Sequence, residues 1–457
     1  MRRHRKQPQW ESLPRVHPHA AGLDIGAREI WACVPSDRDP EPVRRCGTFT
    51  PDLVALVDWL IECGVDTVAM EATGVYWVPI FELLEARGLK ACLVNAQHLK
   101  RVPGRKSDFL DCQWIQKLHS LGFLAASFRP DAEMCALRTY LRHRAQLIQH
   151  RAPHILHMQK ALHQMNVQLT QVLTDVTGVT GLAILRAIVA GERDPVKLAR
   201  LRNPACKSSE DEIAKALTGT WQPEHVFALQ QSLELYDFYT QKVAECDTAI
   251  EQHFAALRPR WVTTNEPGLP RTKRGSKSKN RPALNVRAHL YHLTGVDLVA
   301  VEGISESIAQ TLLSEIGTDM SKWPSEKHFA SWLGLAPHND ISGGRVLRSR
   351  TLPTANRAGQ ALRMAAQSVA RSDSAFGAFY RRMKSRAGPE QAITATAHRI
   401  ARTVYFLLKH RAAYCDIGAE AYNQRQGEKT IASLKRQAAK LGFMLTPHLA
   451  EPAPAGD

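Results

Sequence analysis

The stretch "AAGLDIGAREIWACVP", residues 20–35, consists of two short apolar runs separated by a turn that contains glycine. Runs of this length and composition predict a β-hairpin. The first run carries Asp24 among apolar neighbours, where a charge is unfavourable unless it is paired or binds a metal. The stretch therefore predicts both the start of a sheet and a candidate functional residue.

The sequence after this hairpin continues to alternate short apolar runs with amphipathic segments. Such alternation predicts a sheet covered by helices. We expect three more strands, in "VRRCGTF" (43–49), "DTVAMEA" (66–72) and "LKACLVN" (89–95), and helices over 51–63, 76–87 and 105–121. Residues 20–128 are thus predicted to form an α/β domain with a mixed sheet, preceded by a basic tail over 1–19.

The composition of the whole chain restricts its class. With 457 residues, the chain is expected to form two or three units. Lys and Arg number 60 against 44 Asp and Glu, an excess that predicts a polyanionic partner, although an inert basic surface is the alternative. Nine cysteines without a CxxC pair indicate reduced thiols, and no apolar run is long enough to span a membrane. We expect a soluble, cytoplasmic protein without a membrane partner.

Residues 129–257 are predicted to be helical, because apolar residues recur there at heptad spacing. One seam, over four heptads, comprises Leu141, Ile148, Ile155, Leu162 and Leu169, with Leu137, Met158, Met165 and Val172 at the companion position, which Arg144 and Arg151 interrupt. A second seam comprises Leu229, Tyr236, Val243, Ile250 and Leu257. Such seams predict coiled-coil pairing, either of these helices with each other or across a dimer.

The rest of the chain divides into three stretches. Residues 258–292 are basic and rich in Gly, Pro and Ser, which predicts a flexible linker. Residues 293–415 return to helical periodicity, and "VEGISESIAQTLLSEIG" (301–317) is typical of a helix-hairpin-helix, although Ser305 stands where a second glycine is preferred. A C-terminal helix and tail are expected over 416–457.

Further acidic residues accompany Asp24. Glu71 ends a predicted strand, and "GRKSDFLDCQWI" (104–115) places Asp108 and Asp111 in the first turn of a helix. Alone, that pair is explained better as a helix N-terminus. The set of four carboxylates, however, can converge at one end of a sheet, where it suits two Mg²⁺ or Mn²⁺ ions acting on a phosphodiester. A basic run beside it would guide a polyanion to the site: Lys100, Arg101, Arg105 and Lys106.

The motifs "GLDIG", "MEATGVYW" and "PGRKSDFLDCQWI", followed in the last third by "LGLAPHNDISGGRVLRSRT", "NRAGQALRMAAQS" and "AITATAHRIARTVY", resemble a known family. They are similar to the bacterial insertion-sequence transposases of the IS one-ten type, relatives of the Piv-like DNA invertases. The resemblance implies an RNase H/RuvC-like domain with an Asp-Glu-Asp-Asp metal site at Asp24, Glu71, Asp108 and Asp111.

The segment "NDISGGRVLRSR" (339–350) offers a second site. From the residues alone, Ser342, Gly343 and Gly344 are read best as a turn, with neighbouring arginines that grip phosphate. The resemblance implies instead that Ser342 is the nucleophile that joins DNA covalently. The arginines that would stabilise a phosphoryl transition state are Arg345, Arg348 and Arg350, and Asn356 and Arg357 are weaker candidates for substrate contact.

These features together predict a DNA transposase in which the four carboxylates and Ser342 form one composite site. The resemblance implies double-stranded DNA as substrate, at the ends of the element and at the target, and an element-encoded non-coding guide RNA. The seams suggest a homodimer, with a tetramer in the synaptic complex. Two alternatives remain, namely a RuvC-like junction endonuclease that uses metal alone, and a nucleic-acid-binding protein without catalysis.

Overall fold

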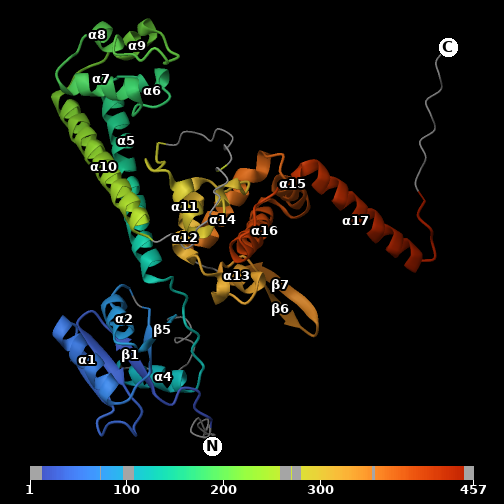
Figure 1. Cartoon of the computed structure of the whole chain (residues 1–457). Coiled ribbons are helices and arrows are strands. Elements are labelled where there is room, and N and C mark those ends of the chain that lie inside the picture. Colours follow the sequence, from blue (N-terminus) through green and yellow to red (C-terminus); the bar gives the residue numbers. More distant parts are fainter. Residues whose placement is uncertain are drawn as a thin grey trace, which may run out of the picture. The chain divides into compact units, whose positions relative to one another are not determined.

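The computed structural model describes residues 13–72, 74–95, 108–257, 269, 279–351 and 356–446, except for the side chains of residues 108–110. The chain divides into two compact units, 1–129 and 130–457 (Figure 1). The basic run predicted to guide a polyanion, Lys100, Arg101, Arg105 and Lys106, lies outside the described residues. No helix within the described ranges is long and apolar enough to cross a membrane.

The first unit contains a five-stranded mixed sheet. Its strands are β1 (Ala20–Ile25), β2 (Glu29–Cys33), β3 (Val43–Gly47), β4 (Thr67–Glu71) and β5 (Lys90–Val94), in the spatial order β3-β2-β1-β4-β5. The first three strands pair antiparallel, whereas β4 pairs parallel with both β1 and β5. This arrangement is consistent with an RNase H-like sheet and confirms the predicted mixed α/β fold.

Helices cover both faces of the sheet. On one face, α1 (Thr50–Glu62) and α2 (Trp77–Ala86) share a core with side chains such as Leu23 and Met70. On the other face, α4 (Asp108–Ser120) packs on Ala69, Cys92 and Val94. Because side chains alternate along a strand, the strand residues next to Leu23 and Met70 point toward α4.

The helix α1 illustrates how the sequence specifies these layers. Its residues Leu53, Leu56, Val57 and Leu60 follow the 3–4 spacing of one helix face and are all buried. The Asp52 carboxylate accepts a hydrogen bond from the backbone N–H of Phe49 at 3.2 Å, which satisfies one of the open donors at the start of the helix.

The second unit begins with two long helices, α5 (Ala132–Gln164) and α10 (Pro223–Ala256), which pack side by side (Figure 1). Their two predicted seams therefore pair within the chain, the first of the two alternatives, and no longer argue for a dimer. Four short helices join the ends of this pair: α6 (Leu169–Val172), α7 (Val179–Val189), α8 (Pro195–Ala199) and α9 (Glu210–Ala216).

The two arginines that interrupt the first seam are buried in the helix pair. Arg144 donates to both carboxylate oxygens of Asp247 on α10 and to the carbonyl of Asn280 at 3.1 Å. Arg151 donates to Thr240 at 3.2 Å and to the Asn280 side chain at 2.7 Å. Each polar interruption thus finds a polar partner, as burial of a charge requires.

The remainder is mostly helical. Its elements are α11 (Val286–Thr294), η2 (Leu298–Ala300), α12 (Glu306–Ile316), η3 (Met320–Lys322), α13 (Glu326–Trp332), β6 (Pro337–Ser342), β7 (Arg345–Thr351), α14 (Arg357–Ser368), η4 (Val369–Arg371), α15 (Ala375–Ala387), α16 (Pro389–His410) and α17 (Gly418–Lys440).

Two details of this part differ from the sequence expectation. The helix α11 begins inside the segment expected to be a linker, because Asn285 caps it and Val286, Leu290 and Leu293 bury one face. Two strands, β6 and β7, also interrupt the predicted helical region. In the helix-hairpin-helix-like segment, Ser305 accepts a hydrogen bond from the backbone N–H of Ile308, so the serine serves as the N-cap of α12.

Candidate functional site

Two of the predicted carboxylates end adjacent parallel strands. Leu23 of β1 pairs with Met70 of β4, so Asp24 and Glu71 are the next residues along the two strands. Neighbouring strands lie about 5 Å apart, and residues side by side in them point to the same face. Asp24 and Glu71 are therefore neighbours, both half-buried, on the face that α4 covers.

The helix α4 runs antiparallel to β1 across this face. Near its C-terminus, the Ser120 carbonyl accepts hydrogen bonds from the backbone N–H groups of Val16 and His17, which precede β1. One turn earlier, the Gln116 side chain donates to the carbonyl of Ala20 at 3.1 Å, at the start of β1. The N-terminal turn of α4, with Asp108 and Asp111, therefore lies toward the end of β1 that carries Asp24.

A glycine allows this close approach. A Cβ atom at Gly22 would come within 2.3 Å of the Gln116 backbone nitrogen and 2.5 Å of the Cys112 carbonyl oxygen. Helix and strand thus touch through their backbones at Gly22, two residues before Asp24. We did not identify Gly22 as a site residue from the sequence, although a glycine inside a strand is a signal of close backbone approach.

Electrostatics also place Asp24 against α4. A hydrogen bond with Cys33 and burial raise the pKa of the Cys112 thiol, and the negative charge of Asp24 raises it further. Asp111, the residue before Cys112, is half-buried, and Ile115 one turn later lies in the core beneath the helix. Asp24 and Glu71 thus lie side by side at one end of the sheet, and Asp111 lies on the first turn of α4, the part of that helix directed toward this end.

The chemistry of this set suits a hard divalent cation, because carboxylate oxygens are the ligands that Mg²⁺ and Mn²⁺ prefer. In the part of the chain that the structure describes, no group of three or more His, Cys, Asp or Glu side chains is close enough to hold a metal. The Asp108 side chain lies outside that part. The described residues therefore place Asp24 and Glu71 side by side and direct the first turn of α4, which carries Asp108 and Asp111, toward the same end of the sheet.

The second predicted site lies on the β6–β7 hairpin. Ser342 pairs with Arg345, so the turn between the strands consists of Gly343 and Gly344 alone. Their φ angles are 54° and 75°, the positive values that a two-residue turn of this type requires at both positions. Both glycines face open space. They shape the tip of the hairpin and leave Ser342 exposed there.

A β-bulge brings the three predicted arginines onto the face of Ser342. Directly opposite residues share a face, and the pairs are Ser342 with Arg345, Asp340 with Arg348, and His338 with Arg350. Positions 338, 340 and 342 alternate regularly along β6, so all three pairs lie on one face. The register shifts between Asp340 and Ile341, which accommodates Leu347 as the extra residue of β7. Without that shift, Arg345 would point away from the other two arginines.

The hairpin is open to solvent. Its apolar residues Ile341, Val346 and Leu347 are 62%, 55% and 71% exposed, and the three arginines are exposed as well. A serine at the tip of such a hairpin, flanked by cations on its own face, is accessible to a large anionic substrate.

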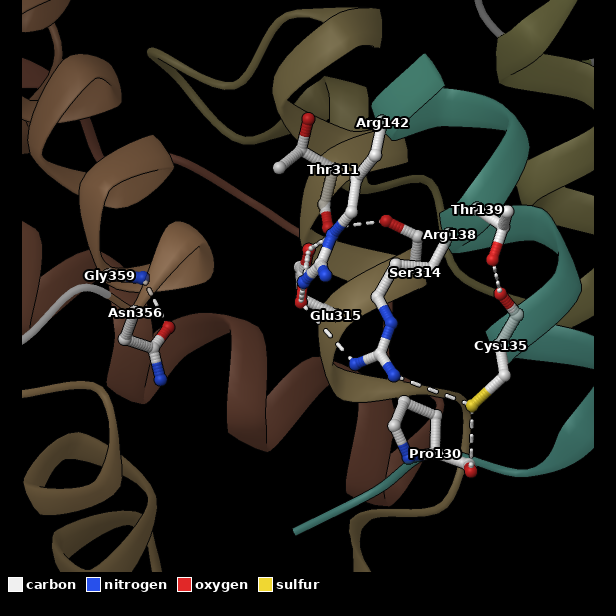
Figure 2. Close-up of polar contacts among 10 residues, drawn as sticks. All are labelled: Pro130, Cys135, Arg138, Thr139, Arg142, Thr311, Ser314, Glu315, Asn356 and Gly359. Atoms are coloured by element: carbon white, nitrogen blue, oxygen red, sulfur yellow. Dashed lines mark hydrogen bonds and ion pairs between the residues drawn. The ribbon is translucent and has the colours of Figure 1, made fainter. Parts of the chain in front are cut away.

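The two weaker candidates have different environments, of which Figure 2 shows that of Asn356. The Asn356 side chain accepts from the backbone N–H of Gly359 at 3.0 Å and donates to the Trp332 carbonyl at 3.2 Å, so it serves as the N-cap of α14. Arg357 is exposed and lines a hollow of about 500 Å³ with residues of α5, including Arg142 and His143. The structure thus gives Asn356 a structural task and leaves Arg357 available for a ligand.

The same region contains an ion pair between α5 and a buried carboxylate of α12 (Figure 2). Glu315 is 9% exposed and accepts three hydrogen bonds of 2.8–3.1 Å from Arg142. Arg138 lies 3.6 Å from the other side of the carboxylate. These contacts fix the long helix pair to the helical part that carries the hairpin.

Two models of known families match the parts of the chain that contain the two candidate sites. A family model for the DEDD type of IS110 transposase, described as "Transposase", matches residues 21–167, which include the sheet and α4. A second model, described as "Transposase IS116/IS110/IS902 family", matches residues 297–381, which include the Ser342 hairpin. No curated protein matches the chain. The two matches follow each other in one chain, and the protein is therefore an insertion-sequence transposase of the IS110 family.

Proposed function

We propose that this transposase breaks and rejoins DNA through a covalent phosphoserine at Ser342, with divalent metal held by Asp24, Glu71, Asp108 and Asp111. The observation that carries the proposal is the geometry of the hairpin, in which Ser342 stands at an exposed tip with Arg345, Arg348 and Arg350 on the same face. The matched DEDD family model supports dependence on a divalent metal.

The carboxylates would act as ligands. Asp24 and Glu71 come from rigid strand ends, and Asp108 and Asp111 come from a helix that is packed against β1 at Gly22. When bound there, divalent cations supply the positive charge that stabilises a phosphodiester during in-line displacement. This scaffold would hold the strand ends and the first turn of α4 in a fixed relation, which is what a site for hard cations needs.

The serine would act as the nucleophile. Its Oγ attacks the phosphorus of the scissile phosphodiester and loses its proton to water, while the bond from phosphorus to the sugar oxygen breaks and that oxygen takes up a proton. The guanidinium groups of Arg345 and Arg348 stabilise the negative charge that develops on the phosphoryl oxygens. In the rejoining step, a hydroxyl of the recipient strand attacks the same phosphorus and releases the serine. The phosphoserine link conserves the energy of the broken phosphodiester bond until the strands are rejoined.

The partners follow from charge and family. The formal net charge of +16 favours polyanions, and a transposase of this family acts on DNA. We further propose that an element-encoded structured RNA guides the choice of target and that the protein works as a homodimer, with a tetramer at the synapse. The guide RNA rests on the family resemblance. The oligomeric state is tested by light scattering of the protein on nucleic acid, where a strictly monomeric protein would refute it.

The test is a denaturing gel with DNA that carries the ends of the element, the transcript of the element and Mg²⁺. We expect a protein–DNA adduct with the wild type and none with Ser342→Ala or Asp24→Asn. Ser331→Ala is a matched control, because Ser331 is an exposed serine on α13, away from the hairpin. Cleavage that persists without an adduct in Ser342→Ala would instead identify a nuclease that uses metal alone.

A further inference from the structure

A second basic surface lies at the base of the Ser342 hairpin. It is an open groove of about 970 Å³ between β7 and the helices α15, α16 and α17. The cations that line it come from all four elements: Arg350, Arg382, Arg399, Arg402 and Lys429. One carboxylate among the lining residues, that of Glu390, opposes these five positive charges. The groove therefore attracts anions.

Aromatic rings hold two of these cations in place. The guanidinium of Arg382 lies 5.8 Å from the ring centres of both Phe379 and Tyr422. The guanidinium of Arg399 lies 5.0 Å and 5.1 Å from the same two rings. Stacking of this kind orients a guanidinium and leaves its N–H donors available for an acceptor. The two arginines are thus organised before any ligand arrives.

Tyr422 adds a donor that the described protein does not satisfy. Its side chain is 6% exposed, and its hydroxyl has no hydrogen-bond partner among the described residues. A buried O–H group without an acceptor is unfavourable and is uncommon in folded proteins. The same tyrosine lines the groove beside the organised arginines. A ligand with acceptor oxygens and negative charge would satisfy the hydroxyl and the cations together.

We propose that this groove binds a backbone phosphate of the DNA strand that leads away from the bond attacked by Ser342. The inference rests on the proposed function of Ser342. Arg350 connects the two places, because it shares the face of Ser342 and also lines the groove. Along the regular strand β6, Ser342 lies four residues from His338, which pairs with Arg350, so the distance is about 13 Å at about 3.3 Å per residue. Since duplex DNA rises about 3.4 Å per nucleotide, the bound phosphate lies about four nucleotides from the scissile bond.

The experiment measures the affinity of the full-length protein for a labelled duplex that carries an element end, over a series of salt concentrations. Tyr422→Phe keeps the ring and removes only the hydroxyl. We expect it to weaken DNA binding at least fivefold, because a hydrogen bond to a charged phosphate is lost. Its melting temperature is expected to be unchanged or higher, because the hydroxyl has no partner within the described protein to lose. If Tyr422 had only a structural role, its substitution would not lower DNA affinity while leaving the melting temperature unchanged.

A pair of lysines on α17 supplies the matched comparison. Lys429 lines the groove, whereas Lys435 is equally exposed on the same helix and is absent from the lining. Lys429→Gln is expected to weaken binding about three- to tenfold and to lower the slope of log K against log salt by about one. Lys435→Gln is expected to stay within about twofold of the wild type. A neutral methylphosphonate about four nucleotides from the scissile bond should weaken DNA binding by the wild type but should not weaken binding by Lys429→Gln any further.

The outcomes separate the two proposals. If the wild type does not bind element DNA at all, the proposed function fails. If the wild type binds, and Tyr422→Phe and Lys429→Gln both bind as tightly as Lys435→Gln, the groove proposal is overturned while the function of Ser342 stands. If Tyr422→Phe and Lys429→Gln lose affinity for the transcript of the element but keep their affinity for DNA, the groove proposal is also overturned and the groove is assigned to RNA.

Discussion

Gly22→Ala is the substitution that tests most sharply how the carboxylates are positioned. The added Cβ atom would lie 2.3 Å from the Gln116 nitrogen, and ordinary contacts begin at 3.4 Å. The neighbouring atoms are backbone, so no side chain can rotate away. The helix α4 must therefore move from β1 by roughly 3.4 Å less 2.3 Å, or about 1 Å.

This displacement should affect catalysis more than folding. Overpacking of a core by one methyl group costs about 1–3 kcal/mol of unfolding free energy. A displacement of about 1 Å in a catalytic group can reduce the rate about a hundredfold. Because α4 carries Asp108 and Asp111, whereas β1 carries Asp24, we expect a loss of about that size in metal-dependent DNA cleavage.

The control is Val57→Ala on α1. Val57 is fully buried in the core on the opposite face of the sheet, and its truncation should destabilise the domain by a similar amount, about 1–3 kcal/mol. Cleavage rates are compared well below the melting temperature of each variant. The reasoning is refuted if Gly22→Ala cleaves at the wild-type rate, or if both variants lose activity in proportion to their loss of stability.

Three further predictions concern the seam, the pH dependence and the hairpin. Arg144→Leu and Asp247→Leu should each cost about 3–5 kcal/mol in urea unfolding, because each leaves a buried charge alone, whereas the double variant should lie closer to the wild type; additive losses would contradict this. Burial, followed by the charge of His17, lowers the pKa of His119 to about 4. The stability that neutral His119 gives to the fold is therefore complete above pH 6.5 and is lost as the pH falls toward 4. The unfolding free energy of the wild type, relative to that of His119→Gln, should therefore fall by about 3 kcal/mol as the pH goes from 6.5 to 4, and a difference that does not change with pH would rule this out. Gly344, with φ of 75°, should tolerate Asn but not Val, so adduct formation should fall in Gly344→Val only; equal yields would show that the turn geometry is unimportant.

The fold of the first unit could be predicted because its strands and helices are short, apolar and regularly spaced. The proximity of Asp24 and Glu71 could be predicted for the same reason, since both lie near the ends of neighbouring apolar strands. Gly22 has no such pattern, and its role depends on where α4 lies, which is a tertiary contact. Local periodicity specifies elements, but close approach between distant segments is decided by packing.

The second unit shows the opposite case. The strands of the Ser342 hairpin are polar and exposed, so they lack the alternation that predicts strands, and the bulge at Leu347 depends on pairing across the hairpin. Arg144 and Arg151 look like defects in a heptad seam because their partners Asp247 and Asn280 are more than a hundred residues away. The start of α11 was predicted to be linker because the residues before it are strongly basic, although Val286, Leu290 and Leu293 have helical spacing.

The central claim is that Ser342 becomes bonded to DNA, and peptide mapping of the adduct tests it directly. Trypsin should release residues 328–345 as one peptide, which contains only two serines, Ser331 and Ser342. After nuclease digestion, mass spectrometry should find this peptide with a nucleotide attached, and fragmentation should place the nucleotide on Ser342. A nucleotide on any other residue, or DNA cleavage without a modified peptide, would contradict the account.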